Sequence, residues 1–177
     1  MKKSNARILL LTHAALIAAL YVVLTYVANL LGIASGAIQI RFSEALTILP
    51  YFTPAAIPGL FVGCLLANLL TGAAVPDIIF GSLATLIGAL LTARFRNNKW
   101  LAPVPPILAN AIIVPPLLLF AYGVKPLWLS YITVTAGEII SCGVLGMLLL
   151  FALEKPMGRF FAEQPFSYHR QGSKLNA

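Results

Sequence analysis

The chain has 177 residues, of which 60% are hydrophobic and only 10% are charged, and its mean hydropathy is +0.92. Twelve Lys and Arg residues and five Asp and Glu residues cannot cover the surface of a soluble domain of this size, so apolar side chains must face lipid. A spanning helix needs about 20 apolar residues. The composition therefore excludes a soluble domain and predicts one all-α membrane domain with short loops.

The net charge of +7 does not indicate a nucleic-acid partner. The basic residues lie at the ends of apolar runs, and no basic stretch is interleaved with aromatic residues that would stack on bases. Membrane topology explains this pattern better, because Lys and Arg gather on the cytoplasmic side of membrane proteins.

The first predicted transmembrane helix covers residues 8–31. A basic segment precedes it, and the apolar run is too long for the core of a signal peptide, so we expect the helix to be retained. Small residues recur along one surface of this helix. Small side chains let a second helix approach closely, so the surface either packs within the bundle or docks another membrane protein. Its residues are Ala14, Ala15, Ala18 and Ala19.

The loop over residues 32–42 leads into a short second helix over residues 43–52, with Ser43 as its N-cap. Arg41 and Glu44 lie three residues apart at this junction. Alone, the two residues would form a surface ion pair, and Glu44 would also be favourable at a helix N-terminus.

A third helix is predicted over residues 54–71 and a fourth over residues 76–95. Asn68 lies near the outer end of the third helix, where it either makes an interhelical hydrogen bond or contacts a ligand. Asp77 follows Pro76 at the start of the fourth helix. Taken alone, this position is typical of a helix cap.

The fifth helix is predicted over residues 100–122. Asn110 lies midway along it, with the same two interpretations as Asn68. Pro115 and Pro116 remove backbone hydrogen bonds and predict a kink. Such breaks are tolerated where neighbouring helices or a cavity satisfy the freed carbonyls, so the two prolines favour a cavity weakly.

Glu138 is the sharpest signal in the sixth helix, predicted over residues 127–154. It lies roughly 16 Å along that helix, near the bilayer centre, where a carboxylate costs at least about 2.5 kcal/mol. Residues on the same face make a polar stripe, and we expect Tyr131, Thr135 and Ser141 to line a cavity wall with it. The alternative is a hydrogen bond that ties helices together; intramembrane ionisable residues more often line a site.

The positive-inside rule sets the orientation. Six spans with a cytoplasmic N-terminus place ten of the twelve basic residues inside and leave only Arg41 and Lys125 outside. Five or seven spans would put the basic tail outside. We therefore predict that both termini are cytoplasmic, with a transmembrane domain over residues 1–154 and a polar tail over 155–177, in the cytoplasmic (inner) membrane. The three charges of Arg41, Glu44 and Asp77 then share the outward side and indicate the mouth of a binding site.

The sequence lacks the residues that several kinds of chemistry require. No Gly-rich phosphate loop with Lys followed by Ser or Thr is present, so an ATP-driven process would need a separate ATPase. His occurs only at positions 13 and 169, and Cys64 and Cys142 lie in apolar runs as small core residues. We therefore expect no metal, no cofactor and no Ser–His or Cys–His nucleophile. The sequence favours a solute-binding protein over an enzyme.

The central sequence is distinctive. It contains IQIRFSEALTILP over residues 38–50, FTPAAIPGL over 52–60, GCLLANL over 63–69 and DIIFGSLAT over 77–85. These segments resemble the QueT family, the substrate-binding (S) components of energy-coupling factor (ECF) transporters for queuosine precursors, and the resemblance covers residues 8–154. It implies a six-helix bacterial membrane protein that binds its solute from outside, then docks on a transmembrane scaffold subunit driven by two cytosolic ATPases.

The resemblance also implies a ligand and a docking face. The ligand is a 7-deazaguanine in its aminomethyl form, and the docking face corresponds to Ala14, Ala15, Ala18 and Ala19. The chemistry agrees, because a carboxylate accepts the N–H groups of a guanine-like edge and a second acid suits a cationic aminomethyl group. The expected ligand-binding residues are Glu138, Asn110, Glu44, Asp77, Asn68 and Arg41, with Tyr131 stacking on the ring.

Two other classes of function stay open from the residues alone. One is a self-contained channel or facilitator for a different vitamin-like solute, and the other is a small intramembrane enzyme. Flux without an ATPase would favour the first, and turnover of a lipid or peptide would favour the second.

Overall fold

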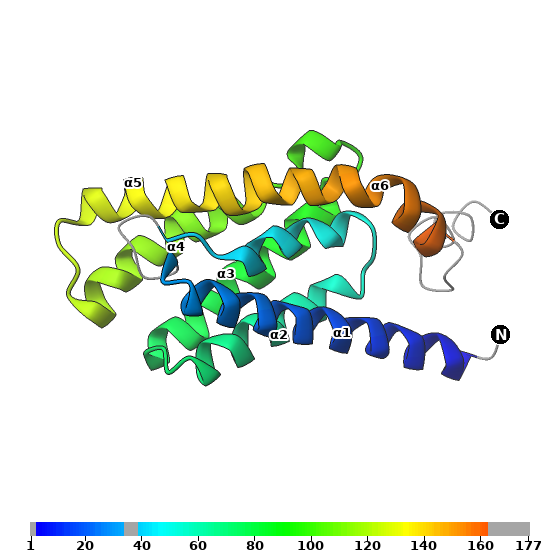
Figure 1. Cartoon of the computed structure of the whole chain (residues 1–177), viewed down its shortest axis with the longest axis horizontal. Coiled ribbons are helices and arrows are strands. Elements are labelled where there is room, and N and C mark those ends of the chain that lie inside the picture. The colour runs from blue at the N-terminus through cyan, green and yellow to red at the C-terminus, as the bar shows by residue number, and fades with distance from the viewer. Residues whose placement is uncertain (1–2, 34–38, 163–177) are drawn as a thin grey trace.

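The computed structural model describes residues 3–33 and 39–162, and in that part of the chain every regular element is a helix. The prediction of an all-α fold is confirmed. In chain order the elements, drawn in Figure 1, are α1 (Lys3–Leu30), the 3₁₀ helix η2 (Phe42–Tyr51), α2 (Ala56–Leu70), α3 (Val75–Arg94), the short η3 (Lys99–Leu101), α4 (Val104–Tyr122), α5 (Leu127–Glu138), the π-helical segment η4 (Ile139–Leu145) and α6 (Gly146–Ala162).

In the described part of the chain, four helical stretches are long and apolar enough to cross a membrane: Asn5–Leu30, Val75–Arg94, Lys99–Tyr122 and Leu127–Pro156. They correspond to the first, fourth, fifth and sixth predicted spans. Helix α2 is apolar but has 15 residues, which at 1.5 Å per residue extend about 22 Å, less than the roughly 30 Å hydrocarbon core. Four of the six predicted spans are thus confirmed as long enough to cross.

The second predicted span differs most from its prediction. It is a ten-residue 3₁₀ helix of roughly 20 Å, and every residue from Ser43 to Pro50 is buried. It contacts α1, α2, α3, η4 and α6, so protein and not lipid surrounds it. Its N-cap is Arg41 and not Ser43, whose hydroxyl oxygen accepts a hydrogen bond from Thr25 at 2.9 Å. An apolar run alone does not distinguish a helix facing lipid from one enclosed by other helices.

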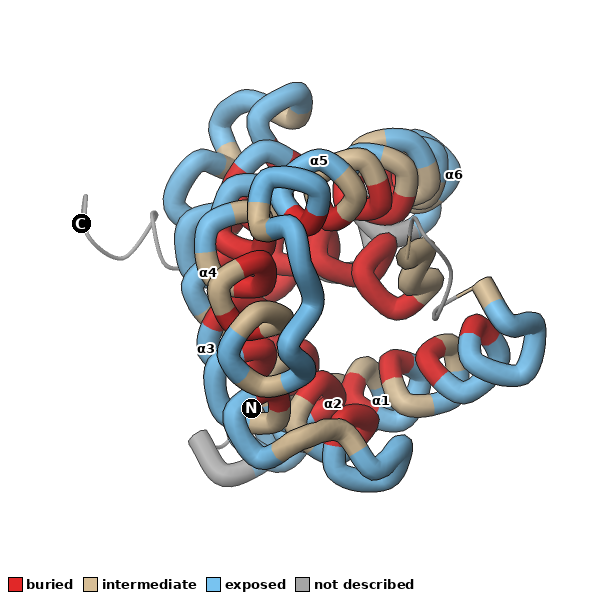
Figure 2. Tube along the Cα trace, turned by 90° about the vertical axis from the view of Figure 1, so that its left-hand side faces the viewer, coloured by how far each residue is buried: buried red, intermediate tan, exposed pale blue. Residues whose placement is uncertain are grey.

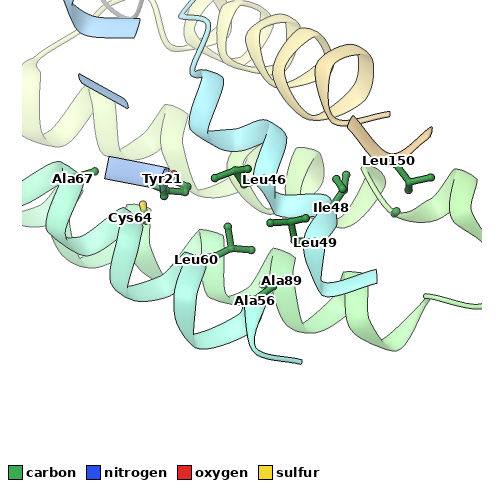
Figure 3. Packing of buried hydrophobic residues seen from close by; sticks show 11 residues of the cluster. Tyr21, Leu46, Ile48, Leu49, Ala56, Leu60, Cys64, Ala67, Ala89 and Leu150 are labelled. Carbon is green, nitrogen blue, oxygen red and sulfur yellow. The ribbon is translucent and has the colours of Figure 1, made fainter. Parts of the chain in front are cut away.

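The core forms around η2. Leu46, Ile48 and Leu49 of η2 are buried together with Leu60 of α2 and Leu150 of α6 (Figure 3). Figure 2 shows buried residues on the inner faces of the surrounding helices and exposed residues on the outer faces. Within a bilayer this packing stabilises the bundle through van der Waals contact, because lipid tails are as apolar as the core.

Large apolar side chains cover the outside of the bundle. On α1 alone Leu11, Leu16, Val23 and Leu30 are 55–84% exposed. A soluble monomer rarely leaves so much contiguous apolar surface uncovered. The structure therefore supports a membrane protein whose outer face meets lipid.

The last helical stretch runs without interruption from Leu127 to Ala162 through the π-helical segment. Its end lies beyond the predicted boundary at residue 154, so the first part of the predicted polar tail continues the helix. Helix α4 likewise continues through Pro115 and Pro116. Residues 163–177 of the predicted tail lie outside the described part of the chain.

The described ends of the chain lie together. In Figure 1 the start of α1 and the end of α6 lie at the same end of the bundle as the turn between η2 and α2. The connections between α2 and α3 and between α4 and α5 lie at the opposite end. This arrangement agrees with a chain that crosses an even number of times, and which end faces the cytoplasm stays a prediction.

The small residues of α1 divide into two sets. Ala14 and Ala18 are 8% and 6% exposed and pack against glycines of α2. A Cβ at Gly59 would lie 2.7 Å from the Ala14 carbonyl oxygen, and one at Gly63 would lie 3.0 Å from the Ala18 Cα. Ala14 and Ala18 therefore pack within the bundle, and their assignment to a docking face stays a prediction. The other two small residues, Ala15 and Ala19, are exposed.

Candidate functional site

Six of the seven predicted site residues converge in the interior of the bundle. Glu44 is only 1% exposed, and Asn110, Asp77, Asn68 and Glu138 are between 4% and 8% exposed. Each of these side chains comes from a different element, and Arg41 precedes η2 and interacts electrostatically with Asp77 and Glu44. The convergence excludes the surface ion pair that Arg41 and Glu44 would form if taken alone.

The deep part of the site holds two carboxylates. Side-chain atoms of Glu44, Glu138 and Cys142 lie within 4.8 Å of one another, and all three residues are buried. The Cys142 thiol donates to Glu138 Oε2 at 3.2 Å and to the Glu44 backbone carbonyl at 3.4 Å. Residues 94 positions apart in the chain thus place two acids side by side.

Two polar atoms in the deep part lack hydrogen-bond partners within the described residues. Tyr21 donates its hydroxyl to Glu44 Oε1, but Glu44 Oε2 has no donor. Asn110 faces both Glu44 and Glu138, and its Nδ2 makes no hydrogen bond within the described residues. A buried polar atom left without a partner costs about 1–3 kcal/mol. Glu44 Oε2 is an acceptor and Asn110 Nδ2 is a donor, and the two side chains interact, so a small movement of Asn110 would join them and a bound ligand could also complete both.

The outer part of the site surrounds Asp77. Tyr122 donates its hydroxyl to Asp77 Oδ2 at 3.2 Å, and Asn68 Nδ2 donates to the Asp77 carbonyl at 3.4 Å. Asp77 lies in the first turn of α3 but does not cap it, since the N-cap is Ala74. A cavity of about 80 Å³ lies here, lined by Thr25, Ala28, Asn29, Arg41, Asn68, Thr71, Ala73 and Asp77.

This cavity adjoins an open groove of about 580 Å³. The two share Asn29, Thr71 and Ala73, and the groove also contacts Tyr26 and Tyr122. The groove therefore gives a route from the surface to Arg41 and Asp77. Glu44, Asn110 and Glu138 do not line the cavity itself, but Arg41, which does, interacts electrostatically with both glutamates.

Gly137 lets the chain before η2 reach the site. The carbonyl oxygen of Gln39 occupies the position that a Cβ at Gly137 would need, so any larger residue would displace the segment that carries Arg41. A second contact one turn further along also holds this segment, because the Arg41 backbone N–H donates to Ser141 Oγ at 3.1 Å. The stretch from Gly137 to Ser141 therefore positions both Glu138 and Arg41.

Tyr131 is not part of this site. It is 40% exposed and lines an open, largely apolar groove on the outside of α5 with Thr135, Ala136 and Ile139. The buried face of α5 is centred near Ser130, Val134 and Gly137. Glu138 is the fourth buried residue of α5, and at about 100° per residue Tyr131 lies roughly 75° from the mean direction of the four. The structure places Tyr131 and Thr135 outside the buried cluster, and the predictions that Tyr131 stacks on the ligand and that Thr135 lines its cavity stay predictions.

Three contacts in the site were not predicted from the sequence. The burial of Tyr21 could have been predicted from the sequence, because it lies at helical spacing from Ala14 and Ala18 on the same face of α1. Cys142 lies one turn beyond Glu138 but was interpreted as a core residue. Tyr122 had no signal, since only the fold brings the end of α4 to the start of α3.

The deep cluster is also the group of residues where a metal ion could be held. The hydrogen bonds favour another use. A metal-bound cysteine is a thiolate, whereas the Cys142 sulfur lies 3.2 Å from Glu138 Oε2 and 3.4 Å from the Glu44 carbonyl oxygen, contacts that suit one thiol hydrogen shared between two acceptors. The arrangement fits a protonated thiol within a polar pocket, and the sequence-based expectation of a metal-free site is retained as a prediction.

Comparison with known proteins adds a family to this geometry. The family described as QueT transporter matches residues 11–155. A curated relative from Lactococcus lactis subsp. cremoris (strain MG1363), named queuosine precursor transporter QueT, is 40% identical over 88 residues. That match covers 48% of this chain and 52% of the relative, so the aligned region spans about half the relative's length. No solved structure matches the chain. Since the family match covers most of the residues, the chain belongs to the QueT transporter family.

Proposed function

We propose that this chain is the membrane-embedded substrate-binding subunit of an ECF-type importer, and that it captures a 7-deazaguanine queuosine precursor in its aminomethyl form. The observation that supports this most is the polar site to which η2 with its N-cap and the helices α2, α3, α4 and α5 contribute side chains, namely Arg41, Glu44, Asn68, Asp77, Asn110 and Glu138. The named relative is a transporter of a queuosine precursor, which agrees with this ligand class.

The charges of the site suit a cationic ligand. Three carboxylates meet one guanidinium, so the site carries an excess of acid in a region where an uncompensated charge is costly. An ammonium group on the ligand would offset that excess. The N–H groups of a guanine-like edge also match carboxylate acceptors, which bind two parallel donors well.

Binding a bicyclic base requires side chains to move. The cavity of about 80 Å³ is smaller than typical ligand pockets of roughly 300–1,000 Å³. Arg41 is the longest side chain that lines it, and displacement of its guanidinium would join the cavity to the deep part of the site. The adjoining groove would admit the ligand from the outward side.

Delivery into the cell would depend on partners. The sequence has no phosphate-binding loop, so energy would come from two cytosolic ATPases through a transmembrane scaffold subunit. We propose Ala15 and Ala19 as the part of the docking face that remains available. Both are exposed on α1, where their small side chains permit close approach of another helix.

The decisive test is ligand binding by the purified protein. Isothermal titration calorimetry with the aminomethyl deazaguanine should show saturable binding, with riboflavin and thiamine as controls that do not bind. Co-expression with a scaffold and two ATPases should then give a complex that imports the ligand in proteoliposomes only with ATP. Absence of binding would overturn the proposed ligand, and ATP-independent flux by the chain alone would favour a self-contained facilitator.

A further inference from the structure

We propose that the ligand binds in one orientation, with its cationic group between Glu44 and Glu138 and its heterocyclic edge against Arg41, Asn68 and Asp77. This inference rests on the proposed function and adds an assignment of the acids. The site would then consist of a deep cation subsite and an outer subsite that reads the ring.

The deep part has the geometry of a cation subsite. Two carboxylates lie within 4.8 Å of each other and of the Cys142 thiol, close enough for one ammonium group to bond to both. Glu44 Oε2 is buried, and the neighbouring Asn110 amide does not reach it with hydrogen-bond geometry within the described residues, so this oxygen can accept a ligand N–H. Asn110 is 4% exposed, faces both carboxylates and adds a side-chain amide with an acceptor and a donor.

The balance of charge separates the two parts. The outer part pairs one guanidinium, Arg41, with one carboxylate, Asp77. Besides these, Asn68 offers an amide, and the Tyr122 hydroxyl already bonds to Asp77. This mixture of donors and acceptors suits a neutral ring edge with a carbonyl and N–H groups. Among the described residues, the deep part holds two carboxylates and no cation except Arg41, which also interacts with Asp77.

The reverse orientation is unfavourable. It would place the ring carbonyl, an acceptor, against two carboxylates. The ammonium group would then lie near Arg41, and like charges in a buried site repel each other. Only the orientation with the cation at the deep end gives each ligand group a complementary partner.

A comparison of two ligands with matched variants tests the assignment. The ligands are the aminomethyl deazaguanine and the same base with a nitrile in place of the aminomethyl group, which removes the positive charge. The variants are Glu138→Gln, which removes a deep charge, and Asp77→Asn, which removes the outer one. Glu138→Asp keeps the deep charge, and Glu44→Gln reports on the same subsite if Glu138→Gln does not fold, as judged by thermal unfolding.

Glu138→Gln should weaken binding of the aminomethyl ligand about tenfold or more and that of the nitrile less than about threefold, so the preference for the cation is lost. Glu138→Asp should retain that preference. Asp77→Asn should weaken both ligands by similar factors. If wild-type protein binds the ligands but Glu138→Gln, or Glu44→Gln in its place, weakens both equally, the assignment is overturned and the proposed function stands. If wild-type protein binds neither, the proposed function fails and the assignment fails with it.

Discussion

Glu44 carries its carboxylate in the interior of the bundle, where only one of its oxygens has a hydrogen-bond donor among the described residues. That donor is the hydroxyl of Tyr21, which is itself 2% exposed. The pair connects α1 to η2 at the deep end of the site. Tyr21 therefore holds a binding residue in place and also contributes to the packing of the core.

Tyr21→Phe should lower the free energy of unfolding by about 1–3 kcal/mol, because it leaves a buried carboxylate oxygen without its donor. Tyr26→Phe on the same helix is the matched control. The Tyr26 hydroxyl donates to the Leu70 carbonyl at 3.0 Å in an exposed position, where water or lipid headgroups can replace it. Thermal unfolding in detergent should separate the two variants, and equal melting temperatures would show that the Tyr21 contact adds nothing.

Residue-level prediction succeeded where the side chain itself was costly. Glu138 in the middle of an apolar helix and Asn110 in another both required a polar partner, and the structure brings them together. Tyr131 lies on the outside of α5, because tyrosine is stable at a membrane surface and its spacing from Glu138 did not fix which side faced inward. Only the packing of α5 against its neighbours decides that.

At the scale of elements, the contact between α1 and α2 depends on small residues from both helices. Ala14→Leu should push α2 away, because Ala14 is only 8% exposed and its backbone already lies close against Gly59 of α2. We expect a loss of roughly 1–3 kcal/mol in stability, the usual cost of overpacking. Ala15 is the next residue and is exposed, so Ala15→Leu should change the free energy of unfolding by no more than a few tenths of a kcal/mol.

The same helix allows a separate test of assembly. Ala15→Trp combined with Ala19→Trp should leave the melting temperature and ligand affinity unchanged, while reducing recovery of the scaffold and ATPases on co-purification. Bulky side chains would block the close helix approach that small residues permit. Full recovery of an active complex would assign the docking surface to another part of the bundle.

Gly137 offers a further test of how α5 positions the site. Gly137→Ala should displace the segment Gln39–Arg41, because the Gln39 carbonyl oxygen occupies the space of the new Cβ. Ligand affinity should fall at least about tenfold, as expected when a charged hydrogen bond is lost. Gly143→Ala in the same helical stretch is the control, since its Cβ would meet only ordinary contacts at 3.7 and 3.8 Å. Calorimetry on both variants gives the answer, and equal affinities would contradict the positioning role.

At the scale of the whole molecule, sidedness remains the main prediction. In a background where Cys64 and Cys142 are replaced by Ala, Asn98→Cys should react with a membrane-impermeant thiol reagent only after cells are opened. Lys125→Cys should react in intact cells. The reason is that this orientation places ten of twelve basic residues on the cytoplasmic side. The opposite labelling pattern would show that the protein has the reverse orientation in the membrane, with the groove facing the cytoplasm.

The sequence by itself determined that this is an all-α membrane protein, where its long apolar helices lie and which buried polar residues needed a partner. These properties depend on the transfer of contiguous side chains between water and lipid, so they can be summed along the chain. Only the tertiary structure decided that residues 42–51 form a short 3₁₀ helix enclosed by others, that Ala14 and Ala18 pack within the bundle, and that Glu44 lies beside Glu138. Those outcomes depend on how helices far apart in sequence pack together, and on which face each presents to its neighbours; hydropathy carries no information about either.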